Sequence, residues 1–224
     1  MPDTSEIRAE LRQVLFGRVA LVDGIAPPLV FVAVNAIWGV FPAAFAGVVS
    51  AIAITLWRLS MGRPLRFALA GLAGVGVATA LALRSGDAED FFLPGIATGT
   101  LTSLVILGSI LVRRPFVAWT SWLTRGWPLE WYWHPQVRPA YTLTSWIWLG
   151  YFVARTFLQW QLYSAGDTEG LAVARVLLGW PGLLLLLIAT YVLGRRRLDA
   201  LAGPSVAEFE SGQERPWAGQ RSGF

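Results

Sequence analysis

The apolar positions along the chain fall into six long hydrophobic stretches separated by short polar segments. A helix needs roughly 20 mostly apolar residues to cross a hydrocarbon core of about 30 Å. The stretches approach or meet this length near residues 22–40, 42–58, 65–83, 91–112, 139–163 and 170–193. The pattern predicts an all-α fold, a polytopic transmembrane helical bundle of six spans over 21–197, preceded by a cytoplasmic N-terminal segment over 1–20.

Two segments outside the spans have patterns of their own. On a helix over 115–127, Phe116, Trp119, Leu123 and Trp127 form one stripe, with Ser121 and Arg125 opposite. This arrangement is typical of an amphipathic helix that lies in the cytoplasmic interface of a membrane. From residue 198 to 224 the apolar residues give way to Gly, Pro, Ser and Glu, a composition that predicts a disordered tail.

The composition supports a membrane protein and narrows the chemistry. Hydrophobic residues make up 55% of the chain, and only 14% are charged, against about 25% in soluble proteins. The absence of Cys excludes disulfide frameworks, Cys-zinc sites, iron–sulfur clusters and thiol nucleophiles, and the lone His134 excludes a His-pair site. Phosphate-binding glycine loops, hydrolase elbows and metalloprotease motifs are also missing. We therefore expect no metal, no cofactor, no nucleic-acid partner and no enzymatic activity.

The charges indicate how the spans are oriented. Every basic residue is Arg, and the arginines cluster in alternate connections, before span one, after spans two and four, and after span six. The other connections carry only Arg84, and they hold acidic residues. The positive-inside rule then places both termini in the cytoplasm of a multi-pass protein of the plasma membrane.

Asp23 and Asn35 are polar residues of the first span. Asp23 lies one turn before Pro27-Pro28, where missing amide donors leave carbonyl oxygens open. Its carboxylate could help to hold a cation there, or could pair with Arg18 or Arg113. Asn35 could hydrogen-bond to a neighbouring helix.

A second polar group lies in the outer half of spans five and six. Arg155, Gln159 and Arg175 are inside these spans, and an ionisable residue within a span is a functional candidate. The simplest arrangement pairs the arginines with carboxylates of the outer loops, Glu89, Asp90 or Glu169. The alternative is a binding site for an anion or a lipid headgroup between spans four, five and six.

Tryptophan is concentrated in one part of the chain, since eight of the twelve lie between 119 and 160. Indole rings favour the headgroup level of a membrane. The rings that we expect to face lipid at the interface are Trp119, Trp122, Trp127, Trp131 and Trp133. The simpler interpretation is an aromatic belt, and the alternative is a ring-lined pocket for a lipid headgroup, an isoprenoid or a quinone.

Two acidic turns are similar to each other. Ser85-Gly86-Asp87-Ala88-Glu89 and Ala165-Gly166-Asp167-Thr168-Glu169 each precede an apolar run that contains Pro-Gly. They are either traces of a repeated helical hairpin or turns that share the same local chemistry.

Several motifs occur in an order typical of one family. They are Asp23-x3-Pro27-Pro28-Leu29-Val30-Phe31, Arg58-Leu59, Gly86-Asp87-Ala88-Glu89-Asp90-Phe91-Phe92-Leu93-Pro94-Gly95-Ile96, Ser109 through Arg113-Arg114-Pro115, Arg138-x2-Tyr141, Trp148-x3-Phe152-x2-Arg155, Gln161-Leu162-Tyr163 and Ala174-Arg175-x2-Leu178-Gly179-Trp180-Pro181. Over residues 18–197 the chain resembles a family of uncharacterised integral membrane proteins of actinobacteria. Its first four spans also distantly resemble the intracellular septation protein A family, which is linked to maintenance of the cell envelope and septum, and this chain adds two spans.

These patterns lead to two functional hypotheses. The first is a non-enzymatic membrane protein that supports the cell envelope, with membrane lipids, a membrane protein or a second copy of itself as partner. The second is a small solute or ion transporter or channel, whose path would be lined by Asp23, Asn35 and the Arg155/Arg175 strip.

Overall fold

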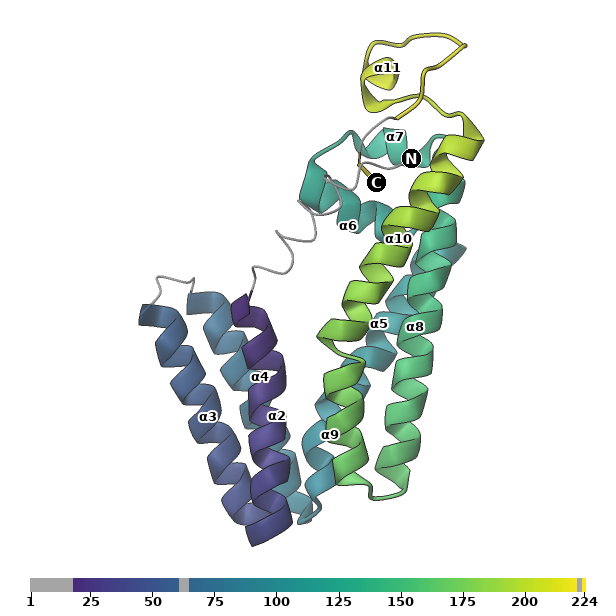
Figure 1. The fold of residues 1–224 in the computed structure, drawn as a ribbon. Coiled ribbons are helices and arrows are strands. Elements are labelled where there is room, and N and C mark those ends of the chain that lie inside the picture. The colour runs from purple at the N-terminus through teal and green to yellow at the C-terminus, as the bar shows by residue number, and fades with distance from the viewer. Residues whose placement is uncertain (1–17, 61–64, 221–222) are drawn as a thin grey trace. The chain divides into compact units, whose positions relative to one another are not determined.

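The computed structural model describes residues 18–60, 65–220 and 223–224, and every regular element over these residues is helical (Figure 1). Side chains of 18–27, 58 and 65–71 lie outside the description. The chain divides into two compact units. Of the described residues, unit 1 comprises 18–60, 65–98 and 155–182, and unit 2 comprises 99–154, 183–220 and 223–224.

Unit 1 is built on three long helices and the elements that cover them. The long helices are α2 (Arg18–Trp38), α3 (Val40–Ser60) and α4 (Leu65–Ser85), and they are followed by a short 3-10 helix, η1 (Ala88–Phe92). The unit also contains the start of α5 (Leu93–Leu111), the end of α8 (Arg138–Ser164) and all of α9 (Thr168–Leu177). Helix α3 packs against α2 and α4, while α9 packs against α2 and η1.

Small residues allow the helices of unit 1 to approach closely. Ala43, Ala44 and Gly47 of α3 are buried, and the Phe31 ring of α2 stacks on Phe91 of η1 with ring centroids 4.1 Å apart. A Cβ atom at Gly47 would already contact both rings, at 3.8 and 3.9 Å. This is the packing expected between helices whose surroundings are as apolar as their own side chains.

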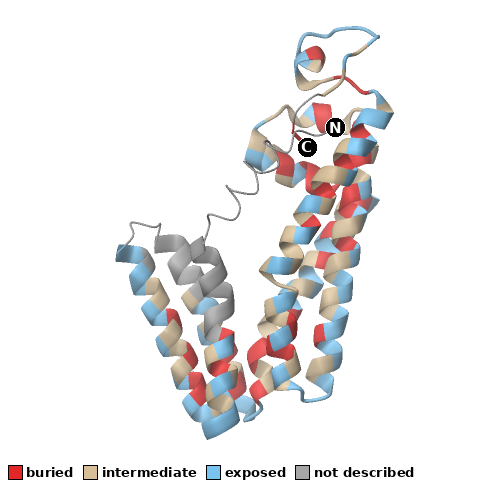
Figure 2. Cartoon of the chain, in the orientation of Figure 1, coloured by how far each residue is buried: buried red, intermediate tan, exposed pale blue. Residues whose placement is uncertain are grey.

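The distribution of side chains on α3 is the reverse of that on a helix of a soluble protein. Its buried face carries Ala and Gly, whereas Phe41, Phe45 and Leu56 are largely exposed, Phe45 to 74%. Figure 2 shows buried and exposed positions alternating along this helix. Large apolar side chains that face outward together require an apolar environment, so α3 has the surface of a helix that contacts lipid.

Three helical segments are long and apolar enough to cross a membrane. They are Val40–Trp57, Ala88–Leu111 and Thr168–Leu201, and shorter apolar helices cover Pro28–Trp38 and Leu72–Ser85 within the residues searched. Each of the six predicted spans corresponds to helix in the structure. The chain is thus an all-helical protein with three clear membrane-crossing candidates, and six spans remain a prediction.

The predicted sixth span is interrupted between α9 and α10 (Trp180–Leu201). A Cβ atom at Gly179 would lie 2.5 Å from the carbonyl oxygen of Arg175, closer than such atoms can approach. Pro181 follows and has no amide hydrogen to continue the helix ladder. Glycine therefore permits a tight break in this apolar segment.

Unit 2 contains α6 (Phe116–Arg125), α7 (Leu129–Trp133), α11 (Val206–Glu210) and large parts of α5, α8 and α10. Its main core is aromatic, with Trp131, Tyr132 and Tyr141 fully buried together. The Trp148 indole of α8 donates a hydrogen bond to the Thr190 hydroxyl of α10, with the two atoms 2.7 Å apart. The buried rings therefore connect α7 to α8, and the Trp148–Thr190 hydrogen bond connects α8 to α10.

Helix α6 lies within the predicted 115–127 segment, and its exposed side is apolar. Val117, Ala118 and Ser121 are buried, while Leu123 is 73% exposed. Ser121, predicted opposite the apolar stripe, faces the protein because its hydroxyl hydrogen-bonds to Tyr132. The exposed Trp119–Leu123 stripe keeps the surface expected of a helix in a membrane interface.

The predicted disordered tail differs from the structure. Helix α10 continues to Leu201, and α11 follows with a capping box formed by Ser205 and Glu208. The Glu208 carboxylate also accepts hydrogen bonds from the backbone amides of Ala218 and Gly219, at 2.6 and 3.2 Å. One side chain thus organises this loop, which composition alone does not reveal.

Candidate functional site

Arg155, Gln159 and Tyr163 form one stripe along the part of α8 that belongs to unit 1. They are spaced four residues apart, so their side chains share a face of the helix. Gln159 is only 4% exposed, and Arg155 and Tyr163 are half-buried. The stripe therefore presents polar groups to the protein along about 12 Å of helix, taking 1.5 Å per residue.

Two acidic residues of the loops, Asp90 and Asp167, have hydrogen-bond partners near the end of this stripe. The Tyr163 hydroxyl donates a hydrogen bond to Asp90 Oδ1 over 2.5 Å. A Cβ atom at Gly166 would lie 3.5 Å from Glu89 Oε1, which places that carboxylate beside the α8–α9 turn. Asp167 caps α9 by accepting a hydrogen bond from the Gly170 amide at 2.7 Å. The carboxylates of Asp90 and Asp167 therefore stabilise the two turns by hydrogen bonds.

Arg175 of α9 lies deeper, against the start of α5. A Cβ atom at Gly95 would lie 2.9 Å from a terminal nitrogen of the Arg175 guanidinium, so glycine makes the room for this side chain. Arg155 is near enough for the two positive charges to repel each other. The structure thus brings the two predicted arginines together within unit 1.

The predicted pairing of these arginines with loop carboxylates is not observed. Among the side chains that the structure describes, which do not include those of 18–27, 58 and 65–71, neither Arg155 nor Arg175 has an acidic partner within 4 Å, and the ion pair described joins Arg195 to Asp199. Geometry explains the separation, because Glu169 lies six residues from Arg175, or about 9 Å along α9. Asp90 is instead held by Tyr163, two turns away from Arg155.

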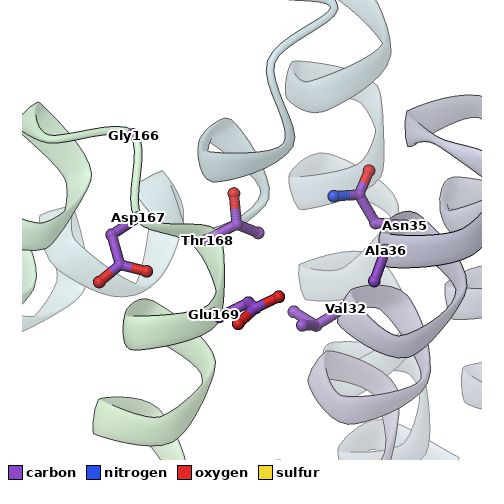
Figure 3. A pocket seen from close by; sticks show the side chains of 7 residues that line it. All are labelled: Val32, Asn35, Ala36, Gly166, Asp167, Thr168 and Glu169. Carbon is purple, nitrogen blue, oxygen red and sulfur yellow. The ribbon is translucent and has the colours of Figure 1, made fainter.

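Asn35 lines a polar cavity of about 320 Å³ in unit 1. The other lining residues are Val32 and Ala36 of α2 with Gly166, Asp167, Thr168 and Glu169. Figure 3 shows the Glu169 side chain directed toward Val32, whereas the Asp167 carboxylate turns away toward its own helix. Asn35 thus faces an acidic turn of the protein. Asp23 belongs to α2, but its side chain lies outside the described residues.

The five tryptophans predicted to face lipid divide into two groups. Trp119 is exposed, and Trp122, Trp127 and Trp133 are half-buried at the edge of the aromatic core. Trp131 is 0% exposed, and its indole nitrogen donates to the carbonyl oxygen of Pro204 at 2.9 Å. The prediction for Trp131 is therefore wrong.

The stripe on α6 ends because Gly126 closes that helix with a φ of 69°. Pro128 then starts α7 in a new direction, which turns Trp131 and Tyr132 into the core. Burial raises the pKa of Tyr132, with a smaller opposing effect from the Ser121 hydrogen bond and from Arg125. Tyr132 is therefore a neutral, structural hydroxyl at physiological pH.

Two residues of the site were missed by the sequence reasoning. Tyr163 continues the Arg155–Gln159 spacing by one more turn, so helical periodicity could have identified it. Gly95 follows a proline and has no sequence signal that predicts an arginine beside it. Within the residues searched, no cluster of three or more His, Asp or Glu side chains could hold a metal ion.

Both acidic turns contain a glycine with positive φ, Gly86 at 85° and Gly166 at 68°. Glycine adopts this conformation without steric cost. The two turns therefore share the same local backbone conformation.

Comparisons with known proteins identify a family. No curated protein and no solved structure matches the chain. One family model matches residues 15–200, which include all the helices from α2 to α9 and nearly all of α10. The chain therefore belongs to the family described as "Protein of unknown function (DUF3159)".

Proposed function

We propose that this protein is a six-span integral protein of the plasma membrane, with both termini in the cytoplasm, that binds a phosphate-bearing lipid headgroup at Arg155 and Arg175. Its role is to support the cell envelope by holding lipid or a partner protein, not to catalyse a reaction. Helices at all six predicted positions and the alternating arginine distribution support this topology.

The arginine pair is the observation that carries the binding proposal. Two guanidinium groups lie near each other, and the described residues supply no carboxylate within ion-pair distance of either. Like charges held together in a medium of low dielectric constant are unfavourable unless a counter-charge joins them. An anion between the two groups removes this repulsion.

A phosphate group fits this pair by its chemistry. Arginine presents planar, forked N–H donors that match phosphate oxygens in bidentate contacts. The Arg175 guanidinium packs against Gly95, and Gln159 adds a neutral amide one turn from Arg155. Asp90 is engaged by Tyr163 and Asp167 by the α9 cap, so these two carboxylates do not compete for the arginines.

Mass spectrometry of the protein extracted directly into native-membrane nanodiscs tests the proposal. We expect a stoichiometric phospholipid that is lost in Arg155→Gln and Arg175→Gln. Arg84→Gln is the matched control, because Arg84 is exposed at the end of α4. A wild-type protein without bound phospholipid, or equal loss in the Arg84 variant, would contradict lipid binding at this pair. The same spectra report a protein partner or a homo-oligomer.

The cavity beside Asn35 favours one second candidate, a small transporter or channel. In reconstituted vesicles such a protein would give a solute or ion flux that Asp23→Asn or Arg155→Gln abolishes without unfolding the protein. A broad panel of ions and solutes without any flux would exclude this candidate.

A further inference from the structure

Residues 223–224 insert into the aromatic core of unit 2. The Phe224 side chain is 8% exposed, and its ring stacks on Tyr141 of α8 with centroids 4.4 Å apart and planes 8° apart. Trp131 and Tyr132 belong to the same buried cluster. Phe224 thus occupies a defined ring-binding position.

Glycines form the space that Phe224 fills. A Cβ atom at Gly194 of α10 would collide with the Phe224 ring, so any larger residue there would close the position. Gly223 has a φ of 76°, and a Cβ on it would lie 2.6 Å from an Arg125 guanidinium nitrogen and 2.9 Å from the Trp127 ring. Both the wall and the inserted segment therefore require glycine.

Two arginines hold the backbone of the inserted residues. Arg125 Nε of α6 donates to the carbonyl oxygen of Phe224 at 3.2 Å. A terminal nitrogen of Arg195, on α10, donates to the carbonyl oxygen of Gly223 at 3.5 Å. The pocket therefore contacts a ring and the two main-chain oxygens next to it.

The walls of this pocket are held by contacts that do not involve Phe224. The Trp148–Thr190 hydrogen bond joins α8 to α10, and the Ser121–Tyr132 hydrogen bond joins α6 to α7 at 3.1 Å. Trp131 is anchored separately to Pro204. Removal of Phe224 would leave a ring-sized gap between standing walls, with two guanidinium groups at its mouth.

We propose that this pocket is a recognition site for a phenylalanine ring with adjoining main-chain oxygens, and that the chain's own residues 223–224 are its resident ligand. Residues 223–224 are then a releasable latch on unit 2. Release exposes a preformed site, which a segment of the same chemistry can occupy in trans. The latch is independent of the lipid site of unit 1, because the two use different residues.

Peptide binding to the full-length protein in nanodiscs tests this proposal. The probe is a fluorescent, amidated peptide of residues 213–224. We expect Phe224→Ala, which vacates the pocket, to bind the peptide at least tenfold more tightly than the wild type does. Gly194→Leu added to Phe224→Ala should abolish binding, as should Phe224→Ala in the peptide. Equal binding by wild type and Phe224→Ala, or binding that does not need the peptide's ring, would overturn the proposal.

A second measurement keeps the test decisive if Phe224→Ala fails to fold. Gly194→Ala lies within a helix and should expel the ring while leaving α10 intact. Hydrogen exchange in the segment 211–224 should then be at least tenfold faster than in Gly150→Ala, where a Cβ meets nothing within 4 Å. The same exchange rate in both variants would refute the latch.

Discussion

Replacement of Trp131 separates a core tryptophan from a membrane anchor. A ring that faces lipid at the headgroup level would leave the fold largely unchanged when truncated in detergent. Trp131 is fully buried among Tyr132, Tyr141 and Trp127, and its indole donates a hydrogen bond to the Pro204 carbonyl at 2.9 Å. We therefore expect Trp131→Ala to destabilise the protein strongly.

The magnitude follows from the contacts that are lost. Truncation of a buried aromatic side chain to alanine costs about 3–5 kcal/mol in free energy of unfolding. Trp131→Phe keeps most of the ring but leaves the buried Pro204 carbonyl without its donor, which costs about 1–3 kcal/mol. The two variants therefore divide the stabilisation into packing and hydrogen bonding.

Denaturant unfolding in detergent micelles, followed by near-ultraviolet circular dichroism, measures both costs. Trp146→Ala is the matched control, because Trp146 lies in the same unit and is 49% exposed; we expect it to change the unfolding free energy by about 0.5 kcal/mol or less. If Trp131→Ala cost no more than the Trp146 variant, the aromatic core of unit 2 would be refuted.

Two further predictions concern the tail and the break between α9 and α10. Hydrogen bonds, first from the Ser205 amide and then from the Ala218 amide, lower the pKa of Glu208 to about 2. Its stabilisation of the loop is complete above the ordinary carboxyl pKa and is lost as pH falls through about 2, so the Ala218 amide resonance should shift over that acidic range in the wild type but not in Glu208→Gln. Gly179→Ala should lower the unfolding free energy by about 1–3 kcal/mol, because its Cβ would meet the Arg175 carbonyl. Gly74→Ala, whose Cβ meets nothing within 4 Å, should not be destabilised in the same denaturation assay.

The helices could be predicted from the sequence because each long apolar run also has the length of a helix. The interruption at Gly179 was missed, since it depends on one close approach between a Cβ and a carbonyl oxygen. The direction of α7 was missed for a similar reason. Gly126 ends α6 with a positive φ, and the next helix buries Trp131, which the sequence pattern does not reveal.

The candidate site was predicted in part. Helical spacing placed Arg155 and Gln159 on one face, and both arginines lie near each other as the predicted polar strip requires. The sequence could not show whether carboxylates reach these arginines, because that depends on where η1 and the α8–α9 turn place Asp90 and Glu89. The order of the tail was also hidden, because it rests on the hydrogen bonds of Glu208 and not on apolar content.

The ring cluster of unit 2 gives the protein a spectroscopic signature of its own. Trp127 and Trp131 meet at 5.3 Å with planes 82° apart, and Trp119 and Trp122 meet at 5.8 Å with planes 90° apart. Indoles this close and this steeply inclined couple their electronic transitions, and the resulting exciton circular dichroism vanishes when fixed side-chain packing is lost while helix content persists. All four rings belong to unit 2, so these two couplings monitor the packing of that unit without any added label.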